Sequence, residues 1–344
     1  MRHLELHMIQ SVPVACLNRD DFGSPKTALF GNAQRARVSS QCWKRAARER
    51  MQEASPALFS GQRTRLVLEP LRKLLQEKHG LDAAEAQKGA EDLGEAISKL
   101  DTPPVRVKTL FFTSPQELEA LAAAYAQTQK AATAVKALGS KPVMKDAADL
   151  ALFGRMVASD HSLTLEGAAM FSHALSTHKV SNEIDFFSAV DDLQPAEDAG
   201  AGMTGTLEYS SATYYRFAAL NLDMLADASH LGTMTPEERQ EVTRVFVAAT
   251  VQAVPGARKN SMNANTLPSH VLAVIREKGH PVQLVNAFEK PVWTPGGLVE
   301  KSIELMEGEY ARLKETWGLE AVLECRMPHI SLSRMLQEIA QHVR

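Results

Sequence analysis

The sequence predicts an α+β fold in which a helical segment interrupts a strand-containing domain, and three observations support this. The chain opens on an alternating segment, residues 2–9, as a strand does. Residues 60–148 are rich in alanine and other helix-forming residues. Strand-like and helix-like segments then follow one another to the end of the 344 residues, a length that suits one large domain with an insertion.

The N-terminal region is expected to contain a strand, a loop and a helix. The alternation predicts a half-buried strand, with Leu4, Leu6 and Met8 on one face and His3, Glu5 and His7 on the other. Residues 10–37 show no periodicity and are marked by proline and glycine, which predicts a loop. Ser39 and Ser40 are both good N-caps, so a helix is expected to start there and to run to about Met51.

Beyond the helical insertion the signals alternate again. The glycine-rich residues 195–211 are expected to form a projecting loop or hairpin. Thr235 and Glu238 form a capping box at the start of a helix. Strands are expected near residues 150–157, 165–180, 212–222, 270–276 and 282–288, and helices over about 236–254 and 297–317. This order fits an α+β sandwich of the ferredoxin-like kind.

Charge is distributed unevenly along the chain, whose net charge is −3. The window from Arg19 to Arg50 contains eight basic and three acidic residues, so it carries a net charge of +5 and the rest of the chain carries −8. A basic patch on an acidic body is typical of a localised binding site for a polyanion. A solvated surface helix remains the alternative interpretation of the charge alone.

The basic window has features that bind phosphate. With Ser40 as N-cap and 100° per residue, one helix face holds Gln41, Lys44, Arg45, Arg48 and Gln52. The N–H groups near Ser39 favour an anion at the helix start. Arg35 and Arg37 alternate on the preceding extended run and are expected to point to one side, with Arg19 and Lys26 on the loop before it. Together these features predict a surface that grips a nucleic-acid strand by its phosphates.

The same residues lie within longer motifs. These are Asn18-Arg19-Asp20-Asp21, Pro25-Lys26, Phe30-Gly31, Arg37-Val-Ser-Ser-Gln41, Lys44-Arg45-Ala46, Ser176-Thr-His-Lys-Val180, Ile184–Leu193 and Val254-Pro-Gly-Ala-Arg258. In sequence and order they resemble the crRNA-binding backbone subunit of the type I-E CRISPR Cascade complex, a member of the RAMP superfamily. The motifs span most of the chain apart from the helical insertion and the C-terminal end.

The resemblance implies a hand-like protein. An RRM-like palm would comprise residues 1–59 and 149–344, with helical fingers at 60–148 and a thumb hairpin at about 193–214. Copies would stack head to tail along one crRNA, together with the large, small, 5′-end and crRNA-processing subunits of Cascade, and the assembly would recognise target DNA in antiviral defence. The expected role is non-catalytic and needs no cofactor.

The resemblance also implies a set of RNA contacts. Asn18, Arg19, Lys26, Arg37, Ser39, Gln41, Lys44 and Arg48 would contact the crRNA backbone, and Met156, next to Arg155, would lie against a displaced base. Arg35, Ser40 and Arg45 join this set from the charge and cap pattern. Arg258 and Lys259 are either further RNA contacts or a solvated loop. One departure is Asn32, where the family pattern has a second glycine after Gly31.

Other signals leave alternatives open. Lys130, Lys136, Lys141 and Lys145 are either a solvated helix face or contacts to the phosphates of target DNA. Asp191 and Asp192 could instead belong to a metal-dependent endoribonuclease of a related CRISPR effector. The three scattered cysteines and the isolated histidines predict no metal site. With no apolar run long enough to span a membrane and no signal-peptide core, a cytoplasmic location is expected.

Overall fold

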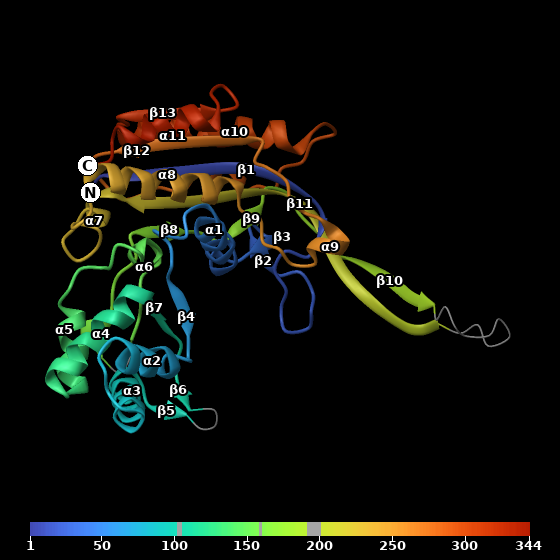
Figure 1. Ribbon diagram of the computed structural model, residues 1–344. Helices are drawn as coiled ribbons and strands as arrows, with labels where there is room; N and C mark the ends of the chain where they lie inside the picture. Colours follow the sequence, from blue (N-terminus) through green and yellow to red (C-terminus); the bar gives the residue numbers. More distant parts are fainter. Residues whose placement is uncertain (102–104, 158–159, 191–200) are drawn as a thin grey trace.

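The computed structural model describes residues 1–101, 105–157, 160–190 and 201–344. Its centre is a nine-stranded sheet in the order β13-β12-β1-β11-β9-β3-β2, with β8 and β10 also paired to β11 (Figure 1). The strands are β1 His3–Ala15, β2 Thr27–Phe30, β3 Ala33–Val38, β8 Ala169–Phe171, β9 Ala174–Ser176, β10 Glu183–Val190, β11 Ala201–Asn221, β12 His270–Arg276 and β13 Leu323–Met327.

Helices cover both faces of this sheet. Leu4, Leu6 and Met8 of β1 share a core cluster with residues of α1, α8 and α11. On the opposite face, Ile9 belongs to a cluster with Met306 of α10. The helices are α1 Ser40–Ala54, α6 Ala148–Phe153, α7 Leu222–Leu225, α8 Pro236–Gln252, α9 Lys259–Met262, α10 Leu298–Trp317 and α11 Leu332–Ala340. The mixed α+β class predicted from the sequence is confirmed.

A second group of helices hangs below the sheet in Figure 1 and has its own core. Buried leucines of this core include Leu71, Leu93 and Leu121. The helices are α2 Leu68–Glu77, α3 Ala83–Ile97, α4 Pro115–Thr128 and α5 Ala131–Gly139. Two small sheets join them, β4 Gln62–Thr64 with β7 Phe111–Thr113 and β5 Leu100–Asp101 with β6 Arg106–Val107.

The β10–β11 hairpin projects from the sheet, on the right of Figure 1. It exposes apolar side chains, among them Ile184 (69%), Phe186 (66%) and Met203 (62%). Its first strand begins at Glu183, ahead of the expected thumb boundary at 193. Residues 191–200, which include Asp191, Asp192 and the start of the expected thumb, lie outside the described residues.

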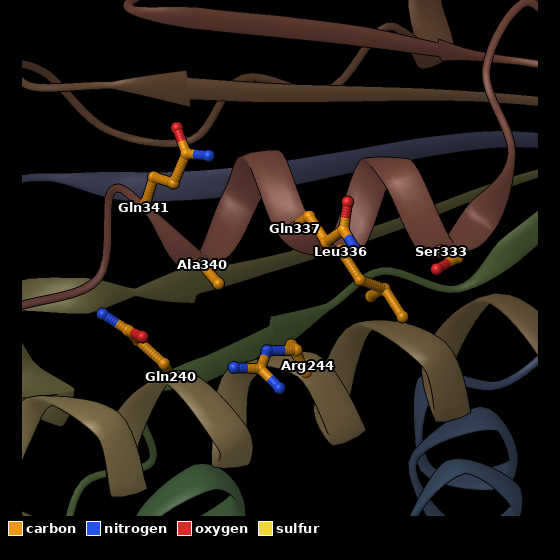
Figure 2. A pocket seen from close by; sticks show the side chains of 7 residues that line it. All are labelled: Gln240, Arg244, Ser333, Leu336, Gln337, Ala340 and Gln341. Atoms are coloured by element: carbon orange, nitrogen blue, oxygen red, sulfur yellow. The ribbon is translucent and has the colours of Figure 1, made fainter.

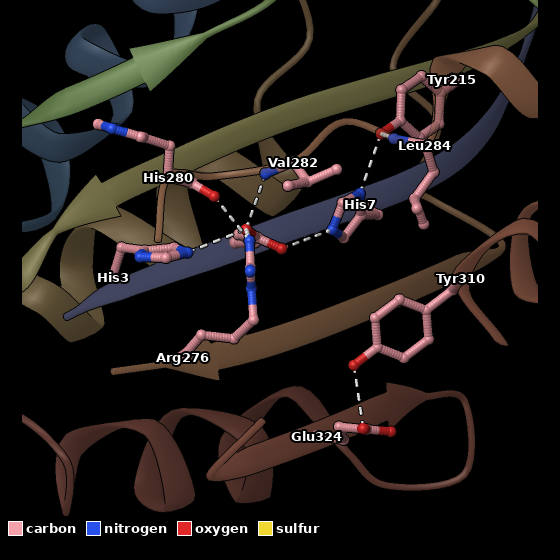
Figure 3. Close-up of polar contacts among 10 residues, drawn as sticks. His3, His7, Tyr215, Arg276, His280, Val282, Leu284, Tyr310 and Glu324 are labelled. Carbon is pink, nitrogen blue, oxygen red and sulfur yellow. Dashed lines mark hydrogen bonds and ion pairs between the residues drawn. The ribbon is translucent and has the colours of Figure 1, made fainter. Parts of the chain in front are cut away.

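The face of β1 that was expected to meet solvent is buried, so the prediction of a half-buried strand was wrong. Glu5 accepts hydrogen bonds from Arg276 and from the N–H of Val282 (2.9 Å), and it is bonded to the rings of His3 (3.0 Å) and His7 (3.4 Å) (Figure 3). Burial raises the pKa of Glu5, but the hydrogen bonds to His3, His7 and Arg276 outweigh it and hold the pKa below its usual range. The polar face of β1 is therefore satisfied inside the protein.

Three other local expectations were also wrong. The loop expected at residues 10–37 contains the end of β1 and the β2–β3 hairpin. The strand expected at 150–157 is occupied by α6, and the one at 282–288 ends in a 3₁₀ turn, Val285–Phe288. A further short 3₁₀ turn lies at His161–Leu163. Within the described residues, no helix combines the length and the apolar character needed to cross a bilayer.

Candidate nucleic-acid interface

The start of α1 is held by side chains of the protein itself. Ser39, not Ser40, is the N-cap, and its hydroxyl accepts from the N–H of Cys42 (3.3 Å). Asn18 Oδ1 accepts from the N–H of Ser39 (2.9 Å), and Nδ1 of His173 accepts from the N–H of Ser40 (3.1 Å). The helix start that was expected to offer these N–H groups to a phosphate thus uses them as internal anchors, which fix the loop before it.

These anchors gather the basic residues of the loop and of β3. The N–H of Lys26 donates to the carbonyl of Asn18 (2.8 Å), and the N–H of Arg37 donates to the carbonyl of Lys26 (2.9 Å). Burial lowers the pKa of His173, and the nearby positive charges of Arg37 and Lys26 lower it further. Lys26 and Arg37 therefore lie near the start of α1, beside the ring of His173, whose lowered pKa favours its neutral form.

Arg258 belongs to the same side of the molecule, although it is far away in sequence. Burial raises the pKa of the Cys16 thiol, whereas the charges of Arg19 and Arg258 lower it, which places both guanidinium groups close to Cys16. Arg19, Arg258 and Lys259 are exposed. The predicted contacts at Arg258 and Lys259 thus lie on the surface at the start of α9.

Along α1 a hollow of about 650 Å³ opens on the basic face. It is lined by Gln41, Lys44, Arg45, Arg48, Glu49, Gln52, Arg63 and Phe153. All five residues that the helical periodicity assigned to one face therefore line the same hollow. Arg63, on β4, was missed by the sequence analysis because it lies outside the basic window and within no motif.

Two of the four cations in this hollow are neutralised within the protein. Arg45 pairs with Glu49 (2.8 Å), and Arg48 pairs with Asp149 (2.9 Å) while donating to the carbonyl of Gly61 (2.7 Å). Lys44 and Arg63 have no carboxylate within ion-pair distance among the described residues. These two cations carry the positive charge that the hollow offers to a ligand.

A second hollow, between α8 and α11, has a different character (Figure 2). Its lining is mostly uncharged, with Gln240, Gln337 and Gln341 among the side chains. Its one cation, Arg244, pairs with Glu241 (2.8 Å). This hollow therefore lacks the net positive charge that a polyanion requires.

The prediction that Arg35 shares an open, phosphate-binding face with Arg37 was wrong. The Arg35 side chain is completely buried, and its guanidinium donates to five backbone carbonyls. The acceptors are Phe30 (3.2 Å), Ser176 (3.1 Å), Thr177 (2.8 Å), Phe288 (2.8 Å) and Glu289 (3.2 Å). Arg35 therefore joins β3 to the segments around it instead of sharing an open face with Arg37.

Arg155 is also turned inward. It pairs with the carboxylate of Glu117 (2.7 Å) and donates to the carbonyls of Phe112 (3.0 Å) and Leu163 (2.8 Å). The next residue, Met156, is 85% exposed. Of the two predicted contacts, Arg155 is thus a buried structural residue, and Met156 is an apolar side chain exposed to solvent.

The lysines of the insertion differ from one another. Lys130, Lys136 and Lys141 are exposed, whereas Lys145 pairs with both carboxylate oxygens of Glu238 (2.9 Å each). Among the described residues, no cluster of three His, Cys, Asp or Glu side chains could hold a metal ion. The pair Asp191 and Asp192 lies outside those residues.

The chain was compared with protein families, with curated proteins and with solved structures. The family described as CT1975-like protein matches residues 4–339. A solved structure titled "CRISPR RNA-guided surveillance complex, pre-nicking" superposes with a TM-score of 0.85 and 27% identity, covering 99% of this chain and 100% of that one. Another, titled "CRISPR RNA-guided surveillance complex", has a TM-score of 0.72 and 24% identity over 99% of both chains, and shares the fold. No curated protein matches the chain.

Proposed function

The chain belongs to the family of CT1975-like proteins, and on that premise we propose that it is a non-catalytic RNA-binding subunit of a CRISPR surveillance complex. In this proposal, copies of the chain oligomerise head to tail along crRNA and form the backbone of the complex, which recognises target DNA. The other subunits of the complex are its further partners. The helical insertion acts as the fingers, and the β10–β11 hairpin belongs to the thumb.

The observation that carries the proposal is the continuity of the cationic surface. Lys26 and Arg37 lie at the start of α1, and Lys44 lies one helical turn further on, in the hollow. None of the three has a carboxylate partner among the described residues, unlike Arg45 and Arg48 beside them. Cations without a carboxylate partner attract phosphates by charge, and contacts to phosphates carry no sequence information, as a subunit that accepts any guide sequence requires.

The opening strand is consistent with this mode of binding. RRM domains that read sequence stack bases on aromatic side chains of their central strands. β1 contributes none, since His3–Ala15 contains no Phe, Tyr or Trp. Binding through the backbone, tolerant of sequence, fits this strand better than base readout.

The test is expression of the chain with and without a CRISPR array, followed by purification and analysis of bound nucleic acid. We expect one discrete RNA to copurify only when the array is present, together with particles larger than one chain. A protein free of RNA in both cases would refute the proposal. Incubation of the loaded particles with complementary RNA and Mg²⁺ addresses the endoribonuclease alternative, which requires regularly spaced products that vanish in Asp191→Asn/Asp192→Asn.

A further inference from the structure

We propose that Lys44 and Arg63 clamp a single RNA phosphate between α1 and the helical insertion, so that bound RNA fixes the insertion against the sheet. The inference rests on the proposed function in one respect, namely that the ligand is RNA. It adds a residue, Arg63, that no motif indicates, and a mechanical role for the phosphate.

The two side chains approach the hollow from different parts of the fold. Lys44 comes from α1, and its ammonium lies 5.9 Å from the centre of the Phe171 ring on β8. Arg63 comes from β4, and its guanidinium lies 4.8 Å from the centre of the Phe112 ring on β7. Each cation lies within about 6 Å of the centre of an aromatic ring, which favours its position at the hollow before a ligand arrives.

The positive charge of Arg63 acts on Lys44. Burial lowers the pKa of Lys44, and the charge of Arg63 lowers it further. Burial and Arg48 likewise lower the pKa of Arg63, against a smaller opposite effect of Asp149. Two like charges are thus held near each other in a partly enclosed hollow, where their repulsion is stronger than in water.

The neighbouring ion pairs leave a net positive charge beside Lys44 and Arg63. Glu49 is engaged by Arg45, and Asp149 by Arg48, so four cations and two carboxylates leave a charge of +2 in and around the hollow. An anion between Lys44 and Arg63 would convert repulsion into two charge-assisted hydrogen bonds. A phosphodiester fits this role because the hollow opens on the same helix face that follows Lys26 and Arg37.

The junction itself explains why this phosphate would have a structural effect. The guanidinium of Arg48 lies over the same Phe112 ring as that of Arg63, also at 4.8 Å. Arg48 and Gln52 of α1 also donate to the carbonyl of Gly61 (2.7 Å each), at the start of the insertion. A phosphate bound by both Lys44 and Arg63 would add a further bridge at this point, supplied by the RNA.

The experiment compares four forms of the full chain: wild type, Arg63→Gln, Lys44→Gln and the double variant. Affinity for a short single-stranded RNA of mixed sequence is measured by fluorescence anisotropy over a series of salt concentrations. Each single variant should bind roughly tenfold more weakly and lower the slope of log K against log salt by about 0.7, the value for one lost contact to a single strand. Because both residues hold one phosphate, the double variant should lose less than the product of the two single effects.

Arg72→Gln is the matched control, since Arg72 lies on α2 of the same insertion and is already paired with Glu69 (2.7 Å). It should leave both affinity and slope unchanged. Arg63→Lys retains the charge and should keep most of the slope, which separates loss of charge from loss of fold. Hydrogen exchange of β4 and β7 should slow on addition of RNA in wild type but not in Arg63→Gln.

The outcomes distinguish this inference from the proposed function. Wild-type protein that binds no RNA refutes the proposed function. RNA binding by Arg63→Gln equal to that of Arg72→Gln refutes the clamp alone, as does an effect confined to the binding of target DNA by RNA-loaded protein. A measurement without RNA is also decisive: the Lys44 ammonium, followed by NMR of labelled lysine, should titrate at higher pH in Arg63→Gln, and an unchanged titration refutes the coupling.

Discussion

Arg48 donates a 2.9 Å hydrogen bond from Nε to the Asp149 carboxylate, which is fully buried. Burial raises the pKa of Asp149, while Arg48 and the N–H of Gly61 (3.3 Å) lower it. The charge of Arg48 is thus neutralised inside the protein. It holds α1 against the segment that follows the insertion, and Lys44 and Arg63 are left to meet a ligand.

Asp149→Asn should therefore affect stability more than binding. Removing one partner of a buried ion pair costs about 3–5 kcal/mol, because the other charge stays buried without compensation. We expect a loss near the lower end of this range, since the Arg48 side chain is 17% exposed. Urea unfolding measures it. RNA affinity of the folded variant should not fall, and a large loss of affinity with unchanged stability would contradict this role.

Substitution of Arg35 should lower the stability of the protein, whereas substitution of Arg37 should weaken RNA binding. Arg35→Ala leaves five carbonyls, three of them buried, without their donor, so the free energy of unfolding should fall by about 3 kcal/mol or more. Arg37→Ala should change it by less than about 1 kcal/mol and weaken RNA binding instead. Unfolding curves and anisotropy on both variants test the pair, and a reversed pattern would show the assignment to be wrong.

Substitution of Gly31 should destabilise the protein, whereas substitution of Asn32 by glycine should be tolerated. Gly31 has φ +58°, and a Cβ there would lie 1.6 Å from the carbonyl oxygen of Glu289, so Gly31→Ala should destabilise the β2–β3 turn by more than about 2 kcal/mol. Asn32, where the resemblance leads us to expect glycine, also adopts a positive φ of 55°. Asn32→Gly should be tolerated, with a change in the melting temperature of only a few degrees.

Glu307 should make stability fall in acid. Burial raises its pKa, but the hydrogen bonds from His270 (2.8 Å) and Arg326 (3.1 Å) outweigh that effect and bring the pKa to about 2. Because the folded-state pKa is lowered, the stabilisation is fully present above about pH 4.5 and is lost as the pH falls toward 2. Urea midpoints of wild type should therefore drop over this interval.

Glu307→Gln serves as the comparison for that pH profile. It should be less stable than wild type at pH 7, by about 1–3 kcal/mol, since Arg326 loses a charged acceptor. The difference should shrink as the pH falls to about 2, where half of the wild-type carboxyl groups are protonated. A constant difference across this range would rule out Glu307 as the titrating group.

The lysines of the insertion should not contribute equally to contacts with target DNA. Replacing Lys130, Lys136 and Lys141 with glutamine should weaken the binding of duplex target by RNA-loaded particles and lower the salt slope by up to about 0.9 per lost contact. RNA loading should be unchanged. Lys145→Gln should have a smaller effect, because its ammonium is already held by Glu238. Equal effects of all four substitutions would indicate general electrostatics without specific contacts.

Local signals predicted local structure well. The capping box of Thr235 and Glu238 is present, and the strand at His270–Arg276 has the expected bounds. The residues of the basic face of α1 were assigned correctly because helical periodicity determines which side chains share a helix face. The motif-based resemblance to a Cascade-type CRISPR subunit is confirmed by the family match and by the solved structures.

What the sequence could not predict depends on contacts between distant segments. The Arg35 side chain is buried because it donates to the carbonyls of Thr177 and Phe288, which are more than 140 residues away in the sequence. Periodicity could not show that α10 would cover the polar face of β1, and so it assigned His7 and Glu5 to solvent. Arg63 lies outside the basic window and in no motif, and only the packing of β4 beside α1 brings it into the hollow.

The strand β11 is a single stretch of 21 residues that runs from the projecting hairpin to the middle of the sheet. At about 3.3 Å per residue it extends for roughly 70 Å. One end pairs with β10 and the other with β1, and no loop interrupts it between them. A load applied at the outer end is therefore transmitted along a continuous backbone to the middle of the molecule, so the hairpin behaves as a lever arm and not as a tether.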